Sequence, residues 1–127
     1  MTYNELENKL KEINIENNIW IIYIGIIILS WYSNSLEKDY FINNNQYSKE
    51  KYRKIIILIF SILVIIYIYF FKGSIDDIYE LKSTDNSNKI KLTELSAIGS
   101  LLIVISGIIF LYIAYTDQDL NVEIAFN

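Results

Sequence analysis

Residues 55–71 read IIILIFSILVIIYIYFF, seventeen residues without a charge, in which Ser61 is the one small polar side chain. As an α-helix this stretch is about 25 Å long, close to the ~30 Å thickness of a bilayer's hydrocarbon core. Its apolar side chains fall on every face of such a helix, and a fold of 127 residues is too small to cover them all. Lys54 and Lys72 bracket the stretch and can extend to the two interfaces. We therefore predict a membrane-spanning helix over residues 54–72.

A second apolar stretch is longer. Residues 95–115 read LSAIGSLLIVISGIIFLYIAY, twenty-one residues without a charge. That length is enough to span a bilayer with some tilt. Glu94 precedes it, where a helix dipole favours an anion in an early turn. We predict a second spanning helix over residues 94–115.

A third stretch, nearer the N-terminus, is shorter. Residues 19–32 read IWIIYIGIIILSWY, fourteen residues, a length that also occurs in re-entrant segments and signal peptides. Trp20 and Trp31 stand near its two ends, as interfacial anchors do. We interpret it as a short span over residues 17–35. The fold class that follows is an all-α integral membrane protein with three transmembrane helices.

A short leader precedes the first span. Thr2 and Glu5 have the spacing of a capping box, and four apolar residues follow at helical spacing. These apolar residues are Tyr3, Leu6, Leu10 and Ile13. We predict an amphipathic helix over residues 2–14. It either rests on the headgroups or on the protein's own helices, or it docks another protein.

The segment between the first two spans contains a turn and a basic cluster. The Asn43-Asn44-Asn45 triplet predicts a turn, and four basic residues follow it just before residue 55. Such a run either sets the orientation of the protein or recognises anionic headgroups. Basic residues are divided almost equally between the two sides, so both orientations stay open. The candidate lipid-interface residues are Trp20, Trp31, Lys49, Lys51, Arg53, Lys54 and Lys72.

Several classes of chemistry lack their usual residues. The chain has no histidine and no cysteine, and the three apolar stretches contain no charged side chain. A net charge of −4 disfavours nucleic-acid binding. We predict that the chain is not an enzyme and that it binds no cofactor, metal ion, nucleic acid or small-molecule substrate. Its expected partners are the lipid bilayer and other membrane proteins.

The span over 94–115 carries a seam of small residues. Several of them recur at seven-residue spacing, which keeps them on one side of a left-handed helix pair and lets backbones approach closely. Two interpretations stay open: packing within the chain, with Gly25 as one candidate contact, or association with a second copy or a partner subunit. The seam comprises Ser96, Gly99, Ser100, Ser106, Gly107 and Ala114.

The tail over residues 116–127 alternates apolar residues with polar or small ones, at Leu120, Val122, Ile124 and Phe126. This period favours a strand, which either adds to a partner's sheet or lies on the membrane surface. Asp117, Asp119 and Asn121 alternate like the start of a calcium loop. That loop requires Gly at its sixth position, where this chain has Val122, so we predict no calcium site.

These predictions favour an interaction or accessory subunit of a membrane assembly. In size and number of spans the chain resembles phage holins of the three-span type, which implies membrane permeabilisation as an alternative. Holins commonly end in a basic tail, whereas this tail is acidic. A bacteriocin immunity protein is a further alternative. The abundance of Ile, Asn, Lys and Tyr, all with A+T-rich codons, points to the cell membrane of a low-GC bacterium.

Overall fold

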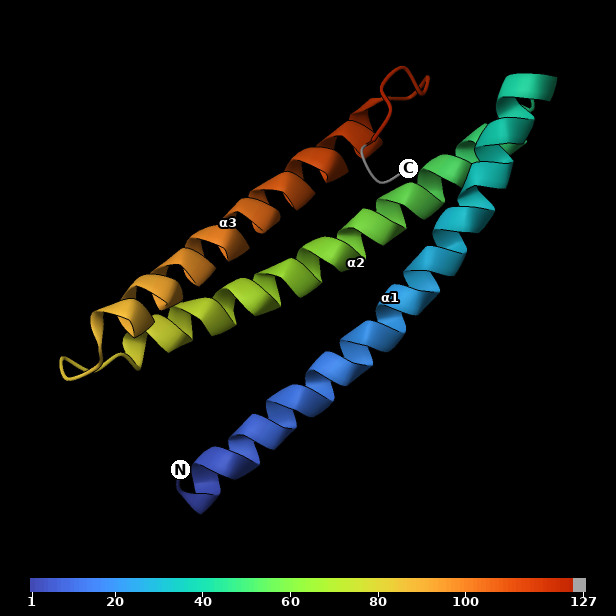
Figure 1. The fold of residues 1–127 in the computed structure, drawn as a ribbon. Helices are drawn as coiled ribbons and strands as arrows, with labels where there is room; N and C mark the ends of the chain where they lie inside the picture. Colours follow the sequence, from blue (N-terminus) through green and yellow to red (C-terminus); the bar gives the residue numbers. More distant parts are fainter. Residues whose placement is uncertain (125–127) are drawn as a thin grey trace.

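The computed structural model describes residues 1–124, which form three α-helices and no strand. They are α1 (Tyr3–Asn43), α2 (Gln46–Tyr79) and α3 (Ser87–Thr116). Helix α2 runs antiparallel to both other helices (Figure 1). All three helices are long and apolar enough to cross a membrane. The prediction of three long apolar helices is therefore confirmed.

The leader and the first span are one continuous helix. Helix α1 has 41 residues, so residues 3–14 are helical as predicted, but they form the first turns of α1 and not a short helix of their own. The predicted capping box at its start is confirmed: Thr2 Oγ1 accepts from Glu5 N at 3.1 Å, and Glu5 Oε2 accepts from Thr2 N at 3.0 Å. No proline interrupts the chain, and extending a formed helix adds a hydrogen bond with each residue.

Helices α1 and α2 are joined by two residues, Asn44 and Asn45, which confirms the turn expected at the asparagine triplet. Asn44 has a φ of 51°, in the left-handed region that asparagine tolerates. The Asn45 side chain caps α2, accepting from Tyr47 N at 3.1 Å and Ser48 N at 3.3 Å. The basic cluster expected in this connection therefore lies within the first turns of α2.

Helices α2 and α3 are joined by residues 80–86. Asp85 turns this loop by accepting from Lys82 N at 2.8 Å, and Asn86 caps α3 by accepting from Lys89 N at 2.7 Å. Both carboxylate and amide oxygens satisfy backbone donors that a turn or a helix start leaves free.

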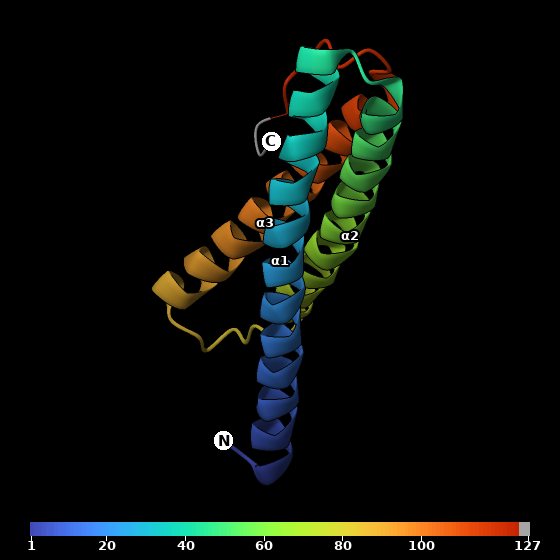
Figure 2. The same ribbon diagram turned by 90° about the vertical axis from the view of Figure 1, so that its right-hand side faces the viewer.

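Helix α2 is the centre of the arrangement. It packs against α1 on one side and α3 on the other, whereas no Cα atom of α1 lies within 8 Å of one in α3 over residues 1–124. The helices are close where α1 ends and α2 begins, and α1 diverges from α2 towards the N-terminus (Figures 1 and 2). The three helices therefore form an open bundle and not a closed triangle.

The core lies along α2 and continues to the end of the bundle where α1 meets α2, which we call the closed end. Its buried members come from all three helices and from the tail: Ile26, Tyr52, Ile56, Ile59, Phe60, Leu63, Ala114 and Ile124. Outside this core, large apolar side chains are exposed along every helix, including Ile27 at 66%, Ile65 at 69% and Leu102 at 58%. An apolar surface of this extent is the pattern of a multi-pass membrane protein.

Candidate interaction sites

Half of the small-residue seam packs on α2. A Cβ built on Gly107 would lie 3.0 Å from Tyr67 Cδ2, which shows how closely the two helices approach. About two turns of helix before it, the Ser100 hydroxyl lies 2.9 Å from that of Ser74. Ala114 is buried at the other end of the interface. These three residues, seven apart, face α2.

The other half of the seam has no contact of this kind. Ser96 and Ser106 are exposed, and a Cβ on Gly99 would meet no atom within 4 Å. At 100° per residue, Gly99 and Ser106 lie about 80–100° around α3 from Gly107. We call Gly99 and Ser106 the small-residue flank of α3. Gly25, the candidate contact on α1, also has no atom within 4 Å of its Cβ position.

The basic cluster is divided among separate partners. Lys49 pairs with Asp119 of the tail at 3.2 Å, and Lys51 lies 5.3 Å from the centroid of the Tyr32 ring. Lys54 is exposed, while Arg53 turns into the bundle. The four side chains therefore do not form one basic patch.

The remaining interface candidates are exposed on the helices. Trp20 packs edge-on against Tyr23, with the ring centroids 5.5 Å apart, and Trp31 is 79% exposed. Lys72 is exposed on α2. Trp31 follows Trp20 by eleven positions of helix, about 16 Å along the axis. Anchoring at both headgroup levels would thus require a locally thinned bilayer.

The tail folds over the closed end of the bundle. The Asp117 carboxylate accepts from Asn121 N at 3.0 Å and Val122 N at 2.7 Å, which forms a tight turn, and Leu120 has a φ of 55°. Ile124 is then 6% exposed in the core. The expected strand is therefore wrong for residues 117–124, because the Asp117 carboxylate offers the backbone a local partner. Phe126 lies outside the described residues.

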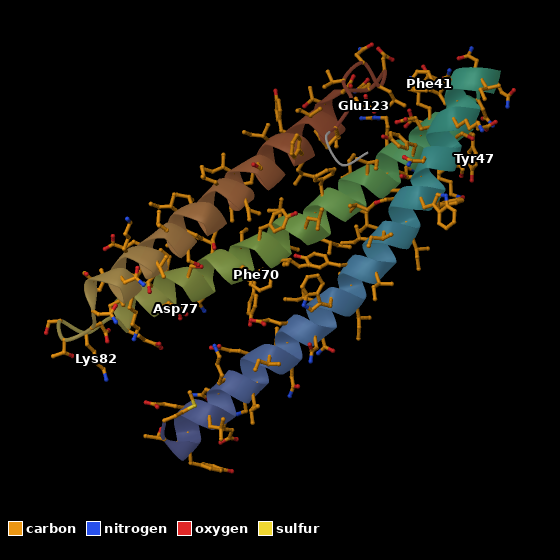
Figure 3. The ribbon with its side chains drawn as sticks, viewed as in Figure 1. Phe41, Tyr47, Phe70, Asp77, Lys82 and Glu123 are labelled. Atoms are coloured by element: carbon orange, nitrogen blue, oxygen red, sulfur yellow. The ribbon has the colours of Figure 1, made fainter. Side chains whose placement is uncertain are left out.

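A cavity of about 300 Å³ lies at this closed end, between the last turns of α1 and α3, the first turns of α2, and the tail. Figure 3 shows Phe41 and Glu123, two of its lining residues, at the same end of the molecule. Its charged and polar lining comprises Glu37, Tyr52, Arg53, Asp117, Asn121 and Glu123. One arginine thus faces three carboxylates, a formal charge of −2.

Arg53 borders this cavity with part of its hydrogen-bonding capacity unused. Its Nη2 donates to the Tyr115 carbonyl at 3.0 Å, and its Nη1 lies 3.7 Å from Glu50 Oε2. Its Nε is buried and has no hydrogen-bond partner among residues 1–124. An unpaired donor on a buried charged group is costly, since desolvation is not offset by a new bond.

Two other ionisable groups of the cavity are tuned by their surroundings. Burial, together with a hydrogen bond to Glu37, raises the pKa of Tyr52, which keeps this hydroxyl protonated. Burial also acts to raise the pKa of Asp117. The N–H groups of Asn121, Val122 and Asp119 and the charge of Arg53 outweigh that effect and hold the Asp117 pKa below its usual value. Asp117 is therefore charged at neutral pH.

An apolar groove adjoins the cavity. It has a volume of about 440 Å³ and runs between α1 and α2, with Trp20, Tyr23 and Ile27 on one wall and Ile59, Leu63 and Tyr67 on the other. Ile56 lines both the groove and the cavity. The two spaces are therefore neighbours along α2, at the level where charged residues give way to apolar ones.

The cavity was not foreseen from the sequence, apart from Arg53. Its lining comes from four segments that are separated along the chain, and no motif in any of them indicates that it contacts the others. The available signal was weak: Glu37 and Asp117 follow apolar stretches closely, and Arg53 precedes one. No family model, no curated protein and no solved structure matches this chain.

Proposed function

We propose that the chain is a non-enzymatic integral membrane protein that serves as an interaction or accessory subunit of a membrane assembly. It docks a helix of a second copy or of a partner subunit on the small-residue flank of α3. The composition supports the cell membrane of a low-GC bacterium as its location. Three apolar helices and the apolar surface they expose support the membrane setting.

The open space around Gly99 is the observation that carries this proposal. The space beside the Cβ position of Gly107, on the neighbouring face, is occupied by the side chains of Tyr67 and Val64. Nothing lies within 4 Å of the Cβ position of Gly99. In lipid, helices associate by close packing of small residues and by hydroxyl hydrogen bonds, since lipid tails supply no hydrophobic drive. Ser106 is exposed, and the half-buried Gly99 has an open Cβ position, so the two residues offer both on the same side of α3.

The open bundle supports the same proposal. Helix α3 has one neighbour, α2, over the described residues, so most of its circumference is available to other helices. A subunit with a single internal contact surface on α3 can add a partner without unpacking its own core.

Bulky substitutions on two helices test the proposal. Gly99→Leu should abolish association with a second copy or a partner while leaving helix content and membrane insertion intact. Gly25→Leu is the matched control, because it adds the same side chain at another glycine with open surroundings. The measurement is crosslinking in the membrane, followed by the mass of the complex in mild detergent.

Two results would contradict the proposal. One is an uncrosslinked monomer in the native membrane, and the other is a Gly99→Leu variant that assembles like the original chain. Expression of the chain in a bacterium should also leave the membrane potential of the cells unchanged. An abrupt collapse of that potential would instead support the membrane-permeabilising alternative.

A further inference from the structure

We propose that the cavity at the closed end of the bundle binds the headgroup of one zwitterionic, amine-bearing phospholipid, and that the adjoining groove holds one of its acyl chains. This site lies on α1, α2, the last turn of α3 and the tail, away from Gly99 and Ser106, the small-residue flank of α3. It is therefore separate from the assembly role proposed above, and either proposal can fail without the other.

The guanidinium of Arg53 can bind a phosphate oxygen. Its Nη2 donates to the Tyr115 carbonyl, whereas its Nη1 lies 3.7 Å from Glu50 Oε2, which is too far for a hydrogen bond. Arg53 lines the cavity, so an external acceptor in that space lies beside the guanidinium. Guanidinium groups bind phosphate oxygens through charge-assisted hydrogen bonds, which are stronger than neutral ones.

The carboxylates of the cavity call for a cation on the same ligand. Glu37 and Glu123 line the same cavity as Arg53. The third carboxylate, Asp117, already accepts hydrogen bonds from backbone N–H groups. A formal charge of −2 disfavours a purely anionic headgroup, because such a headgroup brings no cation to offset the carboxylates. A primary ammonium group satisfies Glu37 and Glu123 while the phosphate satisfies Arg53.

The groove supplies the apolar half of the site. It begins at Ile56, which it shares with the cavity, and continues along Ile59 and Leu63 towards Tyr67. Arg53 stands one turn before Ile56, at the boundary where the charged start of α2 meets its apolar stretch. With its headgroup at Arg53, a lipid would therefore place an acyl chain in the groove, running from the charged start of α2 into its apolar stretch.

The test is native mass spectrometry of the full chain in detergent, titrated with phosphatidylethanolamine and with phosphatidylglycerol of the same acyl chains. Phosphatidylethanolamine should bind at least about tenfold more tightly, as loss of one charged hydrogen bond would predict. Equal binding, or preference for phosphatidylglycerol, would overturn the proposal.

Three variants separate the contributions. Arg53→Gln should weaken the binding of both lipids by about tenfold or more. Glu37→Gln, which can still accept a hydrogen bond from Tyr52, should abolish the preference for phosphatidylethanolamine over phosphatidylglycerol. Lys54→Gln is the matched control: Lys54 is an exposed basic residue beside Arg53, and its substitution should change neither the affinity for the lipids nor the preference between them. If Lys54→Gln weakens binding as much as Arg53→Gln, general attraction to the basic cluster explains the result and the pocket does not.

A competition experiment identifies the source of the phosphate. Glycerophosphoethanolamine and inorganic phosphate, both without acyl chains, should fail to displace the bound lipid at equal concentration. Ile27→Trp, which narrows the groove at an exposed position, should weaken lipid binding. Displacement by either soluble phosphate, or full binding by Ile27→Trp, would overturn the role of the groove. Circular dichroism of each variant verifies that the helices remain folded.

Discussion

Gly107 of α3 packs against the ring of Tyr67 of α2. A Cβ on Gly107 would lie 3.0 Å from Tyr67 Cδ2 and 3.3 Å from Tyr67 Cε2, so the aromatic ring covers the glycine. The contact places a large side chain opposite a missing one, as interdigitated helix packing requires. The seven-residue spacing of Ser100, Gly107 and Ala114 then keeps the same face of α3 on α2.

Gly107→Leu should therefore destabilise the α2–α3 pair by about 1–3 kcal/mol, since an added side chain must displace the Tyr67 ring or the Val64 methyl group. The measurement is the free energy of unfolding in mixed detergent micelles, followed by circular dichroism. Gly25→Leu, which meets no atom within 4 Å, should leave that free energy unchanged. Equal stability of the two variants would contradict the close approach.

Asn45→Ala should cost about 1 kcal/mol, because the α2 cap loses its bonds from Tyr47 N and Ser48 N. Asn44→Gly is the matched control in the same turn, and it keeps the left-handed backbone at a φ of 51°. Thermal unfolding of both variants in detergent gives the comparison. If Asn44→Gly is the more damaging change, the assignment of the two roles is wrong.

Leu102→Lys should prevent insertion of α3, because a lysine near the centre of a spanning helix costs about 2.5–3.5 kcal/mol on insertion scales. Leu92→Lys is its matched control: both leucines are exposed, at 58% and 56%, but Leu92 precedes the span predicted over residues 94–115. Glycosylation sites placed before and after α3 report the topology of each variant. Normal insertion of Leu102→Lys would argue that this part of α3 lies outside the hydrocarbon.

Acid should loosen the tail through Asp117. Its pKa in the folded protein lies below the ordinary value of 3.8, so the charged carboxylate stabilises the tail above that pH, and the contribution disappears as the pH falls through the lower folded value. Amide exchange at Asn121 and Val122 should therefore stay slow, relative to the intrinsic rate, down to about pH 4 and accelerate in stronger acid. Asp117→Asn should show fast exchange at every pH. A transition near pH 6 would contradict this assignment.

The long helices could be predicted from the sequence because a helix that is apolar on every face leaves a signal in every residue. Residues 55–71 and 95–115 are apolar on all faces, and no packing arrangement is needed to read that pattern. The Thr2 capping box and the asparagine turn were equally local, since each depends on side chains within a few residues of the backbone groups they satisfy.

The features that were missed depend on tertiary contacts. Nothing near Asn17 stops a helix, so the continuity of α1 was open to prediction, but the change from polar to apolar sequence was taken as a boundary. The cavity needs Glu37, Arg53 and Asp117 to meet at one end, which follows from the antiparallel order and the two-residue turn. The apolar alternation of the tail indicated a strand, and the local bonds of Asp117 override it.

The unbroken course of α1 has a mechanical consequence. The helix is about 60 Å long, roughly twice the hydrocarbon thickness, so about 20 Å of it projects from the bilayer if residues 17–35 lie within lipid. Residues 3–16 then form a stiff acidic stalk whose tip stands well clear of the headgroups. A fluorophore on that tip and another on Asn44 would report the tilt of the whole protein, because no hinge lies between them.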